Sequence, residues 1–445
     1  MKVYQTKEIR NVALIGGNRV GKTTLAETMA FHGKVIGRRG SVEDKNTLSD
    51  YRDIELERQQ SIQATVMYTE YAGIKINMID CPGFDDFIGE VIGSLRVADT
   101  ALMVINAQNG VDVGAEIQWR WTAKMNTPVM FAVNQLDHEK ANFEETIRQL
   151  KQYFGNNVVP FQYPVNAGIG FDSVIDLLKM KLMKFPVGGG APVIEEIPAS
   201  EKDKAEELHN ALIEAAAEND EALMDKFFEE GSLTEEEMAH GLKLGIISRG
   251  TFPVVCIATK SDQGVTRLME IIKDSCPSPD EMSGVETESG NKLTCKASDP
   301  TAAYVFKTSI EQHIGELAIM KIYGGEITEA MDLVNTTTGA KERLSQVLCV
   351  AGKNKEKVEK AVAGDIIATI KLKGTQSSHT LVKSGSEVIV PTEYPEPKFR
   401  TAVRAKNSSD DEKLGAILNE YRKTDLTFLS EQSKELKQLI ISGQG

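Results

Sequence analysis

The sequence lacks the features that would place the protein in a membrane or in an oxidising compartment. No stretch approaches the roughly 18 uninterrupted apolar residues of a membrane-spanning helix, and the N-terminus lacks the apolar core of a signal peptide. The five cysteines, at positions 81, 256, 276, 295 and 349, lack metal-ligand spacing. With 41% apolar and 26% charged residues, the composition is that of a soluble globular protein. We therefore expect reduced thiols and a cytoplasmic protein without a membrane partner.

Negative charge is concentrated in one segment. The whole chain carries a formal net charge of −14, and residues 195–240, with 16 acidic and 3 basic side chains, account for −13 of it. The remaining 399 residues are nearly neutral. The overall acidity therefore does not exclude an RNA-containing partner for the rest of the molecule.

A glycine-rich stretch near the N-terminus fits the phosphate-binding pattern G-x-x-x-x-G-K-[ST]. An apolar run of strand length, residues 11–15, precedes it, and a helical pattern, residues 24–30, follows it. In this context the backbone N–H groups surround a β-phosphate, and the helix N-terminus adds partial positive charge. Lys22 is predicted to reach the β- and γ-phosphates, and the Thr23 hydroxyl to bind Mg²⁺. The predicted nucleotide-binding residues of this loop are Gly16, Gly17, Asn18, Arg19, Val20, Gly21, Lys22, Thr23 and Thr24.

Two further motifs follow strand-like runs. Asp80 and Gly83 form a D-x-x-G sequence, in which the carboxylate holds Mg²⁺ through water and the glycine N–H senses a γ-phosphate. Asn134 and Asp137 form an N-x-x-D sequence after the apolar residues 128–133. The Asp137 carboxylate can accept hydrogen bonds from both N1–H and the 2-amino group of guanine, which adenine cannot offer. The sequence therefore predicts GTP or GDP, bound with Mg²⁺, as the ligand.

The order of the patterns predicts about three domains. Strands alternating with helices indicate a parallel α/β sheet with its functional loops at one edge. Acidic helices at 201–218 and 220–229 lie in an insertion, residues 161–252, that precedes the last strand of this sheet. Short strands between residues 301 and 391, the last at 386–390, predict a β-barrel. A small α+β unit follows, with a strand at 399–405, a helix at 409–422 and a strand at 439–442.

The three motifs, with residues 212–221, 233–237, 299–303 and 440–443, make the chain resemble bacterial elongation factor G, a translational GTPase, from its first residue to its last. The resemblance implies an α/β P-loop GTPase domain at residues 1–280 with an inserted α+β subdomain at about 161–252. It also implies a β-barrel domain II at 290–395 and an incomplete domain III at 398–445. We expect a piece of a longer protein, because domain III continues and two further domains follow in the family.

The resemblance also implies partners and additional site residues. The implied partner is the ribosome, that is, the ribosomal RNA and the ribosomal proteins, including the stalk protein, which the acidic insertion is expected to contact. The same insertion can also be interpreted as a solvated face without a partner. We expect the protein to be a monomer. Ser61 occupies the switch I position of a Mg²⁺-binding Thr, so the expected metal ligands are Thr23, Ser61 and Asp80. The resemblance implies that the backbone of Ala258 and Thr259 faces guanine O6. Gln135 stands where the family has a Lys that stacks on the base, which predicts modestly weaker nucleotide binding.

Four residues depart from the family pattern around the attacking water. Phe84 follows the D-x-x-G motif, where the family has the His that orients this water, and Phe offers water no hydrogen bond. Asn18 and Gln60 replace the apolar gate that screens this His, and Arg19 replaces an Asp associated with a monovalent cation. None of the six histidines lies in either switch. Because phosphoryl transfer depends on positioning, we expect an elongation factor that binds GTP during translocation but hydrolyses it very slowly, with no assigned catalytic residue.

Two other functions remain open. The first is an ordinary ribosome-stimulated GTPase with another catalytic group, for which Arg19 acting as an arginine finger within the chain is the candidate. The second is a ribosomal protection factor. The insertion at residues 161–252 argues against the second, since such factors generally lack a comparable segment.

Overall fold

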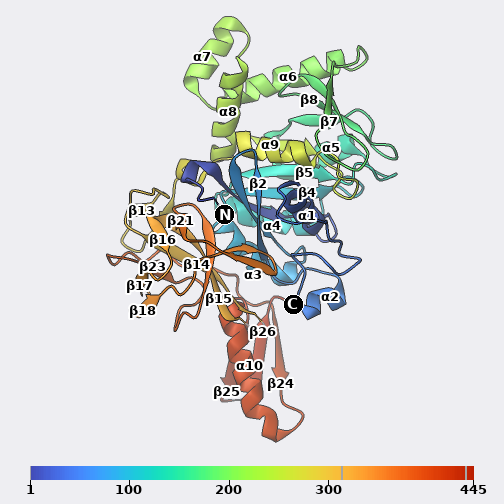
Figure 1. The fold of residues 1–445 in the computed structure, drawn as a ribbon. Helices are drawn as coiled ribbons and strands as arrows, with labels where there is room; N and C mark the ends of the chain where they lie inside the picture. Colours follow the sequence, from blue (N-terminus) through green and yellow to red (C-terminus); the bar gives the residue numbers. More distant parts are fainter. Residues whose placement is uncertain (1, 312–313, 436–437) are drawn as a thin grey trace.

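A seven-stranded sheet forms the centre of the N-terminal part of the chain, residues 6–281, which is called the nucleotide domain here (Figure 1). The computed structural model, which describes residues 2–311, 314–435 and 438–445, orders its strands β2-β3-β1-β4-β5-β11-β6. Neighbouring strands run parallel, except for the antiparallel hairpin of β2 and β3. Helices cover both faces, so the central strands read as continuous apolar runs. The strands are β1 (Ile9–Ile15), β2 (Thr65–Tyr71), β3 (Ile74–Asp80), β4 (Thr100–Asn106), β5 (Val129–Asn134), β6 (Val158–Pro160) and β11 (Phe252–Cys256).

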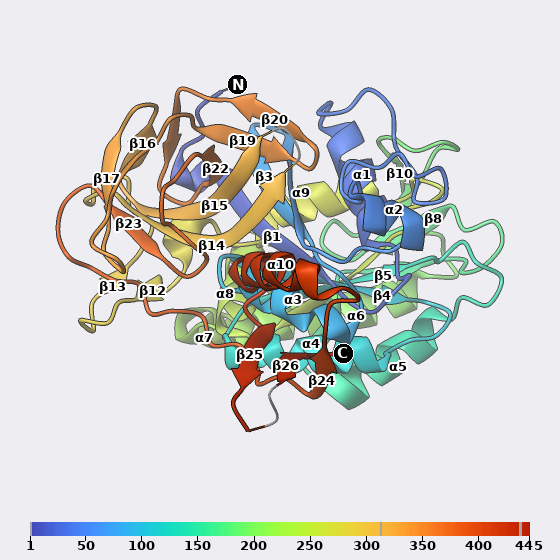
Figure 2. The ribbon, with the colours of Figure 1, turned by 90° about the horizontal axis from the view of Figure 1, so that it is seen from below.

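Helices α1 and α9 lie on one face of this sheet, and α3, α4 and α5 lie on the other (Figure 2). The Asp112 carboxylate caps α4 and the Asn142 side chain caps α5, each by accepting a backbone N–H three residues on, which fixes where these helices begin. Among the described residues, no helix is long and apolar enough to cross a membrane. The helices of the domain are η1 (Thr6–Glu8), α1 (Lys22–His32), α2 (Asp53–Arg58), η2 (Asp85–Phe87), α3 (Ile88–Leu95), α4 (Val113–Lys124), α5 (Phe143–Phe154), α9 (Val265–Ser275) and η3 (Pro279–Glu281).

The segment between β6 and β11 folds as a separate α+β layer at one end of the nucleotide domain (Figure 1). Its four strands form an antiparallel sheet in the order β10-β9-β8-β7. Asp220 and Thr234 cap two of its helices, so the acidic sequence forms well-defined helices. The elements are β7 (Gln162–Pro164), β8 (Ser173–Asp176), β9 (Lys181–Lys184), β10 (Val193–Glu195), α6 (Lys202–Ala217), α7 (Glu221–Glu230) and α8 (Glu235–Ser248).

The next part of the chain, residues 285–390, is called the β domain here. Its main sheet has the strand order β18-β17-β23-β14-β15-β22-β19-β20 and surrounds an apolar core that includes Val305, Met320 and Ile367. The strand predicted at residues 386–390 is wrong: only Ile389 forms a bridge, to Thr287. The strands are β12 (Val285–Glu286), β13 (Lys292–Leu293), β14 (Ala302–Glu311), β15 (Gly315–Gly324), β16 (Glu326–Thr328), β17 (Asp332–Asn335), β18 (Lys341–Arg343), β19 (Leu348–Ala351), β20 (Asn354–Lys357), β21 (Lys360–Val362), β22 (Ile366–Ile370) and β23 (Thr380–Val382).

The C-terminal unit lies below the two larger domains in Figure 1 and packs one helix on a small sheet. Its strands have the order β24-β26-β25. Strand β25 has the polar sequence Leu-Ser-Glu-Gln-Ser and no apolar alternation, which is why the sequence did not predict it. The elements are β24 (Phe399–Val403), η4 (Ser408–Asp410), α10 (Asp411–Thr424), β25 (Leu429–Ser433) and β26 (Gln438–Gly443).

Two buried ion pairs join the nucleotide domain to the β domain. Lys75 Nζ lies 2.7 Å from Asp365 Oδ1, and Lys321 Nζ lies 2.6 Å from Asp99 Oδ1, so each pair has one residue in each domain. The Asn11 side chain donates a further hydrogen bond of 2.7 Å to Asp99 Oδ2. Buried charges are tolerated only when they are paired and hydrogen-bonded. These contacts therefore favour a single arrangement of the two domains.

Candidate functional site

The glycine-rich loop joins β1 to α1 and lies at the carboxyl edge of the sheet. Two of its glycines have little space around them: a Cβ on Gly16 would lie 2.3 Å from the backbone carbonyl oxygen of Val104, and one on Gly21 would lie 2.3 Å from Asn134 Nδ2. Gly21 also has φ of 99°, in the left-handed region that favours glycine. The loop is therefore a tight turn that ends at the N-terminus of α1, where backbone N–H groups can bind an anion.

Lys22 is buried at the centre of this loop. Its Nζ donates hydrogen bonds of 2.9 Å and 2.7 Å to the carbonyl oxygens of Gly16 and Gly17. Burial lowers the pKa of the Lys22 ammonium, although the nearby Asp80 and Asp112 carboxylates oppose this effect. A desolvated cation held by carbonyl oxygens is well placed to exchange these partners for the oxygens of a phosphate.

The three residues predicted to bind a metal are brought together between the loop and β3. Thr23 Oγ1 donates a 2.8 Å hydrogen bond to Asp80 Oδ2 and lies 3.3 Å from the Ser61 hydroxyl. The Ser49 hydroxyl donates a 2.6 Å hydrogen bond to the same Asp80 oxygen. Three hydroxyls and one carboxylate thus meet at one point, from parts of the chain that lie up to 57 residues apart.

The oxygen atoms of this cluster are of the kind that could hold a divalent cation. Within the described residues, Asp80 Oδ1 and Asp50 Oδ1 are buried but have no hydrogen-bond partner. Burial raises the pKa of the Asp80 carboxyl, and burial, followed by the charge of Asp80, raises the pKa of Asp50 to about 7. Two adjacent carboxylates whose charged forms are disfavoured fit a divalent cation, and Mg²⁺ prefers such oxygen ligands together with water and phosphate.

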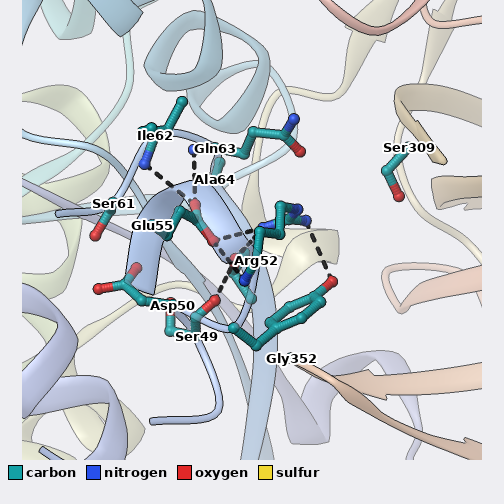
Figure 3. A network of polar contacts seen from close by, with 12 residues as sticks. Ser49, Asp50, Arg52, Glu55, Ser61, Ile62, Gln63, Ala64, Ser309 and Gly352 are labelled. Carbon is teal, nitrogen blue, oxygen red and sulfur yellow. Dashed lines mark hydrogen bonds and ion pairs between the residues drawn. The ribbon is translucent and has the colours of Figure 1, made fainter. Parts of the chain in front are cut away.

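Asp50 and Ser49 were not among the residues predicted to form the site. They lie in the polar segment 33–63, which the sequence indicated as a functional loop, and both are buried, with exposed fractions of 3% and 1%. Figure 3 shows Ser49, Asp50 and Ser61 on the same side of the buried Glu55. Polar composition gave no signal that these side chains turn inward. The only indication in the sequence that Ser49 and Asp50 belong to the site is that a hydroxyl and an acidic residue lie about eleven positions before Ser61.

The N-x-x-D motif holds a second loop against the first. The Asn134 side chain donates a 2.7 Å hydrogen bond to the Val20 carbonyl and accepts a 3.0 Å hydrogen bond from the Thr259 N–H. Asp137 Oδ2 accepts a 2.8 Å hydrogen bond from the Ser261 hydroxyl, which orients the carboxylate. Asn134 thus joins the phosphate loop to the loop after β11, and Ser261 is a site residue that the sequence did not predict.

Ala258 and Thr259 lie in this loop as predicted, but their N–H groups already have partners. The Ala258 N–H donates to the Gln263 carbonyl at 2.9 Å, and the Thr259 N–H donates to Asn134. These bonds shape the loop after β11. That the backbone of this pair faces guanine O6 stays a prediction.

Gln135 connects the two loops in place of a lysine. With φ of 63° it lies in the left-handed region, and its Nε2 donates a 3.0 Å hydrogen bond to the Arg19 carbonyl. The Gln108 side chain donates a 2.5 Å hydrogen bond to Gln135 Oε1. The Gln135 amide is therefore part of a polar brace on the phosphate loop.

The remaining predicted residues are Gly83, Phe84, Asn18 and Arg19, and Gly83 lies directly against the phosphate loop. Gly83 packs against it so closely that a Cβ there would lie 2.5 Å from the Gly17 carbonyl oxygen. Phe84 follows as the residue before η2, and its side chain is half-buried. Asn18 and Arg19 are exposed. The side chains here are a short amide, a long guanidinium group and one aromatic ring.

These loops on this sheet define a P-loop domain that binds guanine nucleotides, and comparison with known families agrees. Residues 7–278 match the elongation factor Tu GTP binding domain, residues 300–384 match elongation factor G domain 2, and residues 394–445 match elongation factor G domain III. The chain belongs to the elongation factor G family of translational GTPases. A crystal structure of a protein from Thermus thermophilus is 27% identical, with a TM-score of 0.88 over 99% of this chain and 64% of that chain.

Proposed function

We propose that this chain is the GTP-binding part of a ribosomal elongation factor that takes part in translocation and hydrolyses GTP very slowly. It spans about 64% of the length of its Thermus relative, and the proposal takes 1–280, 290–395 and 398–445 as the GTPase domain, domain II and the first part of domain III. The contrast between the well-formed binding loops and the altered residues at the water position carries the proposal. The ribosome is the proposed partner, with the acidic helices α6–α8 facing the stalk protein.

The proposed binding mode follows from the contacts of the site. Lys22 and the loop N–H groups bind the β- and γ-phosphates, while Asp137, oriented by Ser261, accepts from the guanine edge. Thr23, Ser61 and Asp80 hold Mg²⁺, and Asp50 adds negative charge beside it. When bound, Mg²⁺ neutralises charge on the β- and γ-phosphate oxygens.

Slow hydrolysis is supported by the residues that the proposal assigns to the side of the γ-phosphate. Phe84 can exclude water but cannot orient it, and no hydrogen bond from its ring can hold a nucleophile in line with the phosphorus. Positioning and charge stabilisation account for nearly all of the catalysis in this reaction. GTP then acts by binding and ordering the switch segments, and not through the free energy of its hydrolysis.

Single-turnover hydrolysis of γ-labelled GTP with excess ribosomes tests this function. We expect binding with hydrolysis about 10²–10⁴-fold slower than for a family member that has the histidine, the usual cost of losing a group that positions water. Binding is measured in parallel by equilibrium dialysis. Hydrolysis at the ordinary rate contradicts the proposal and makes Arg19 the next residue to replace.

A further inference from the structure

The switch I segment, defined here as residues 47–63, buries polar side chains although it lies at the surface between α1 and β2. Thr47, Asp50 and Glu55 have exposed fractions of 2%, 3% and 0%. Buried polar groups are costly unless they find hydrogen-bond partners. The partners of this segment therefore show what holds it in place.

Glu55 closes the segment on itself. Its Oε1 accepts hydrogen bonds of 3.1 Å from the backbone N–H groups of both Ile62 and Gln63, and its Oε2 accepts one of 3.2 Å from Arg52 (Figure 3). Because Ile62 follows Ser61 directly, these bonds fix the backbone that carries the Ser61 hydroxyl. The position of Ser61 next to Thr23 thus depends on the Glu55 carboxylate.

The β domain holds the same segment from outside. Glu311, the last residue of β14, accepts a 2.6 Å hydrogen bond from the Tyr51 hydroxyl, and Arg52 Nη2 lies 3.8 Å from it. Lys355 Nζ lies 3.4 Å from the other Glu311 oxygen. Burial raises the pKa of the Glu311 carboxyl, but the Tyr51 hydroxyl and the Lys355 and Arg52 charges outweigh burial and lower the net pKa. Glu311 is therefore a partly buried, charged anchor for two consecutive residues of switch I.

Backbone contacts reinforce this attachment. The Lys353 N–H donates a 3.2 Å hydrogen bond to the Leu48 carbonyl, and the Gly352 N–H donates one of 2.9 Å to the Val66 carbonyl. A Cβ on Gly352 would lie 2.0 Å from the Leu48 carbonyl oxygen, so the turn after β19 approaches the segment as closely as a backbone can. Both the start of the segment and the strand that follows it contact the β domain.

The same strand also reaches the second switch. Lys307, four residues before Glu311 on β14, forms an ion pair with Glu90 of α3. Glu90 also accepts a 2.7 Å hydrogen bond from the N–H of Ala64, the residue directly after the switch I segment. One strand of the β domain thus contacts the beginning of switch I and the helix that follows the D-x-x-G motif. None of these contacts involves the nucleotide site directly.

We propose that Glu311 is a positioning residue for the magnesium site: through Arg52 and Glu55 it holds Ser61 beside the phosphate loop, so that the β domain orders switch I before nucleotide binds. The metal part of this statement rests on the proposed function, whereas the ordering of switch I without nucleotide does not. The consequence is a switch whose active arrangement depends less on the γ-phosphate than on an adjoining domain.

Hydrogen exchange and nucleotide binding by the full chain test the role of Glu311. In Glu311→Gln, amide exchange over residues 48–63 of the nucleotide-free protein should become about ten- to hundredfold faster, the effect of losing hydrogen bonds to a charged group. The Mg²⁺-dependent part of the affinity for a non-hydrolysable GTP analogue should fall by a similar factor, while affinity in EDTA stays the same. Glu326→Gln, an exposed carboxylate on the same domain paired with Lys360, is the matched control and should change neither quantity.

A milder variant, Tyr51→Phe, removes only the hydroxyl that donates to the Glu311 carboxylate and should accelerate exchange about tenfold, the low end of the effect of losing a hydrogen bond to a charged group. Its effect should largely disappear in the Glu311→Gln background. If Glu311→Gln fails to fold, amide exchange in Tyr51→Phe still tests whether Glu311 positions switch I. Unchanged exchange over residues 48–63 overturns the positioning role, and so does an equal loss of affinity with and without Mg²⁺, which indicates a general loss of structure. A wild-type protein that binds no GTP would refute the proposed function, yet exchange in its nucleotide-free form still tests the anchor.

Discussion

The two sides of the phosphate loop differ in how firmly their side chains are held. On the side proposed to bind nucleotide, Lys22, Asp80 and Asn134 are all buried, with exposed fractions of 6%, 0% and 0%, and each is hydrogen-bonded to a residue of the phosphate loop or of its helix α1. On the side where water would attack, Asn18 and Arg19 are exposed. The first side is part of the core of the molecule, and the second is part of its surface.

This difference explains how one side can change without the other. Replacing a buried, hydrogen-bonded residue leaves a cavity or an unpaired group, whereas surface replacements usually alter stability by less than about 0.5 kcal/mol. Residues such as Asn18 and Arg19 are therefore free to vary as far as folding is concerned. Their identities report on chemistry, while those of the binding loops report on both chemistry and packing.

The largest effect is expected from breaking the buried side. Lys22→Ala removes the central cation of the phosphate loop, and we expect nucleotide affinity to fall by roughly 10²–10³-fold, since truncating a buried charged partner costs about 2–5 kcal/mol. Titration with a fluorescent GTP analogue measures this loss. Lys151→Ala, an exposed lysine on α5, serves as the control, and an equal loss in both variants would contradict the assigned role of the loop.

A substitution on the exposed side should raise the rate of hydrolysis, whereas the substitution on the buried side lowers nucleotide affinity. Phe84→His introduces a group that can orient water, and we expect single-turnover hydrolysis on ribosomes to rise about 10²-fold, the lower end of what such a group contributes, because Asn18, Arg19 and Gln60 remain altered. GTP affinity should not change. Phe87→His places the same side chain at the other end of η2 and should have no effect. An unchanged rate in Phe84→His would assign the defect to the three neighbours instead.

Much of the binding side could be predicted from the sequence because its residues follow strands directly. Asp80 ends β3 and Asn134 ends β5, and a parallel sheet brings these ends to one edge. Asp50 and Glu55 could not be predicted, because their partners are brought to them only when the segment folds back on itself and against β3, and the segment has no periodic pattern. Ser261 was missed for a similar reason: only the folded loop brings it to Asp137.

The fold shows the same division between periodic and irregular sequence. Long apolar runs identified β1, β4 and β5, whereas the polar strand β25 carried no signal and residues 386–390 gave a false one. In that false case an apolar stretch contributes single contacts to the β domain without joining a ladder. Local pattern indicates burial, but tertiary pairing decides whether a buried segment is a strand.

An intermediate effect is expected where the two sides meet. A Cβ on Gly83 would lie 2.5 Å from the Gly17 carbonyl oxygen and 2.7 Å from Asn18 Cα, so Gly83→Ala forces the D-x-x-G loop away from the phosphate loop. We expect affinity for a GTP analogue to fall about tenfold relative to GDP, the scale of about 1–3 kcal/mol for overpacking. Gly415→Ala on α10, where a Cβ meets open space, is the control. Equal losses for both nucleotides would show that Gly83 does not sense the γ-phosphate.

The smallest effect concerns Gln135, which braces the phosphate loop without a charge. Gln135→Lys adds a positive charge near the base and the phosphates but removes the acceptor of the Gln108 hydrogen bond. Because the side chain is half-exposed, we expect affinity to rise only about two- to fivefold, the scale of a solvent-screened charge interaction. Gln432→Lys adds the same charge on the distant β25 and separates this local effect from a change in net charge. A loss of affinity in Gln135→Lys alone would mean that the bonds to Gln108 and to the Arg19 carbonyl stabilise the loop more than a cation at this position can.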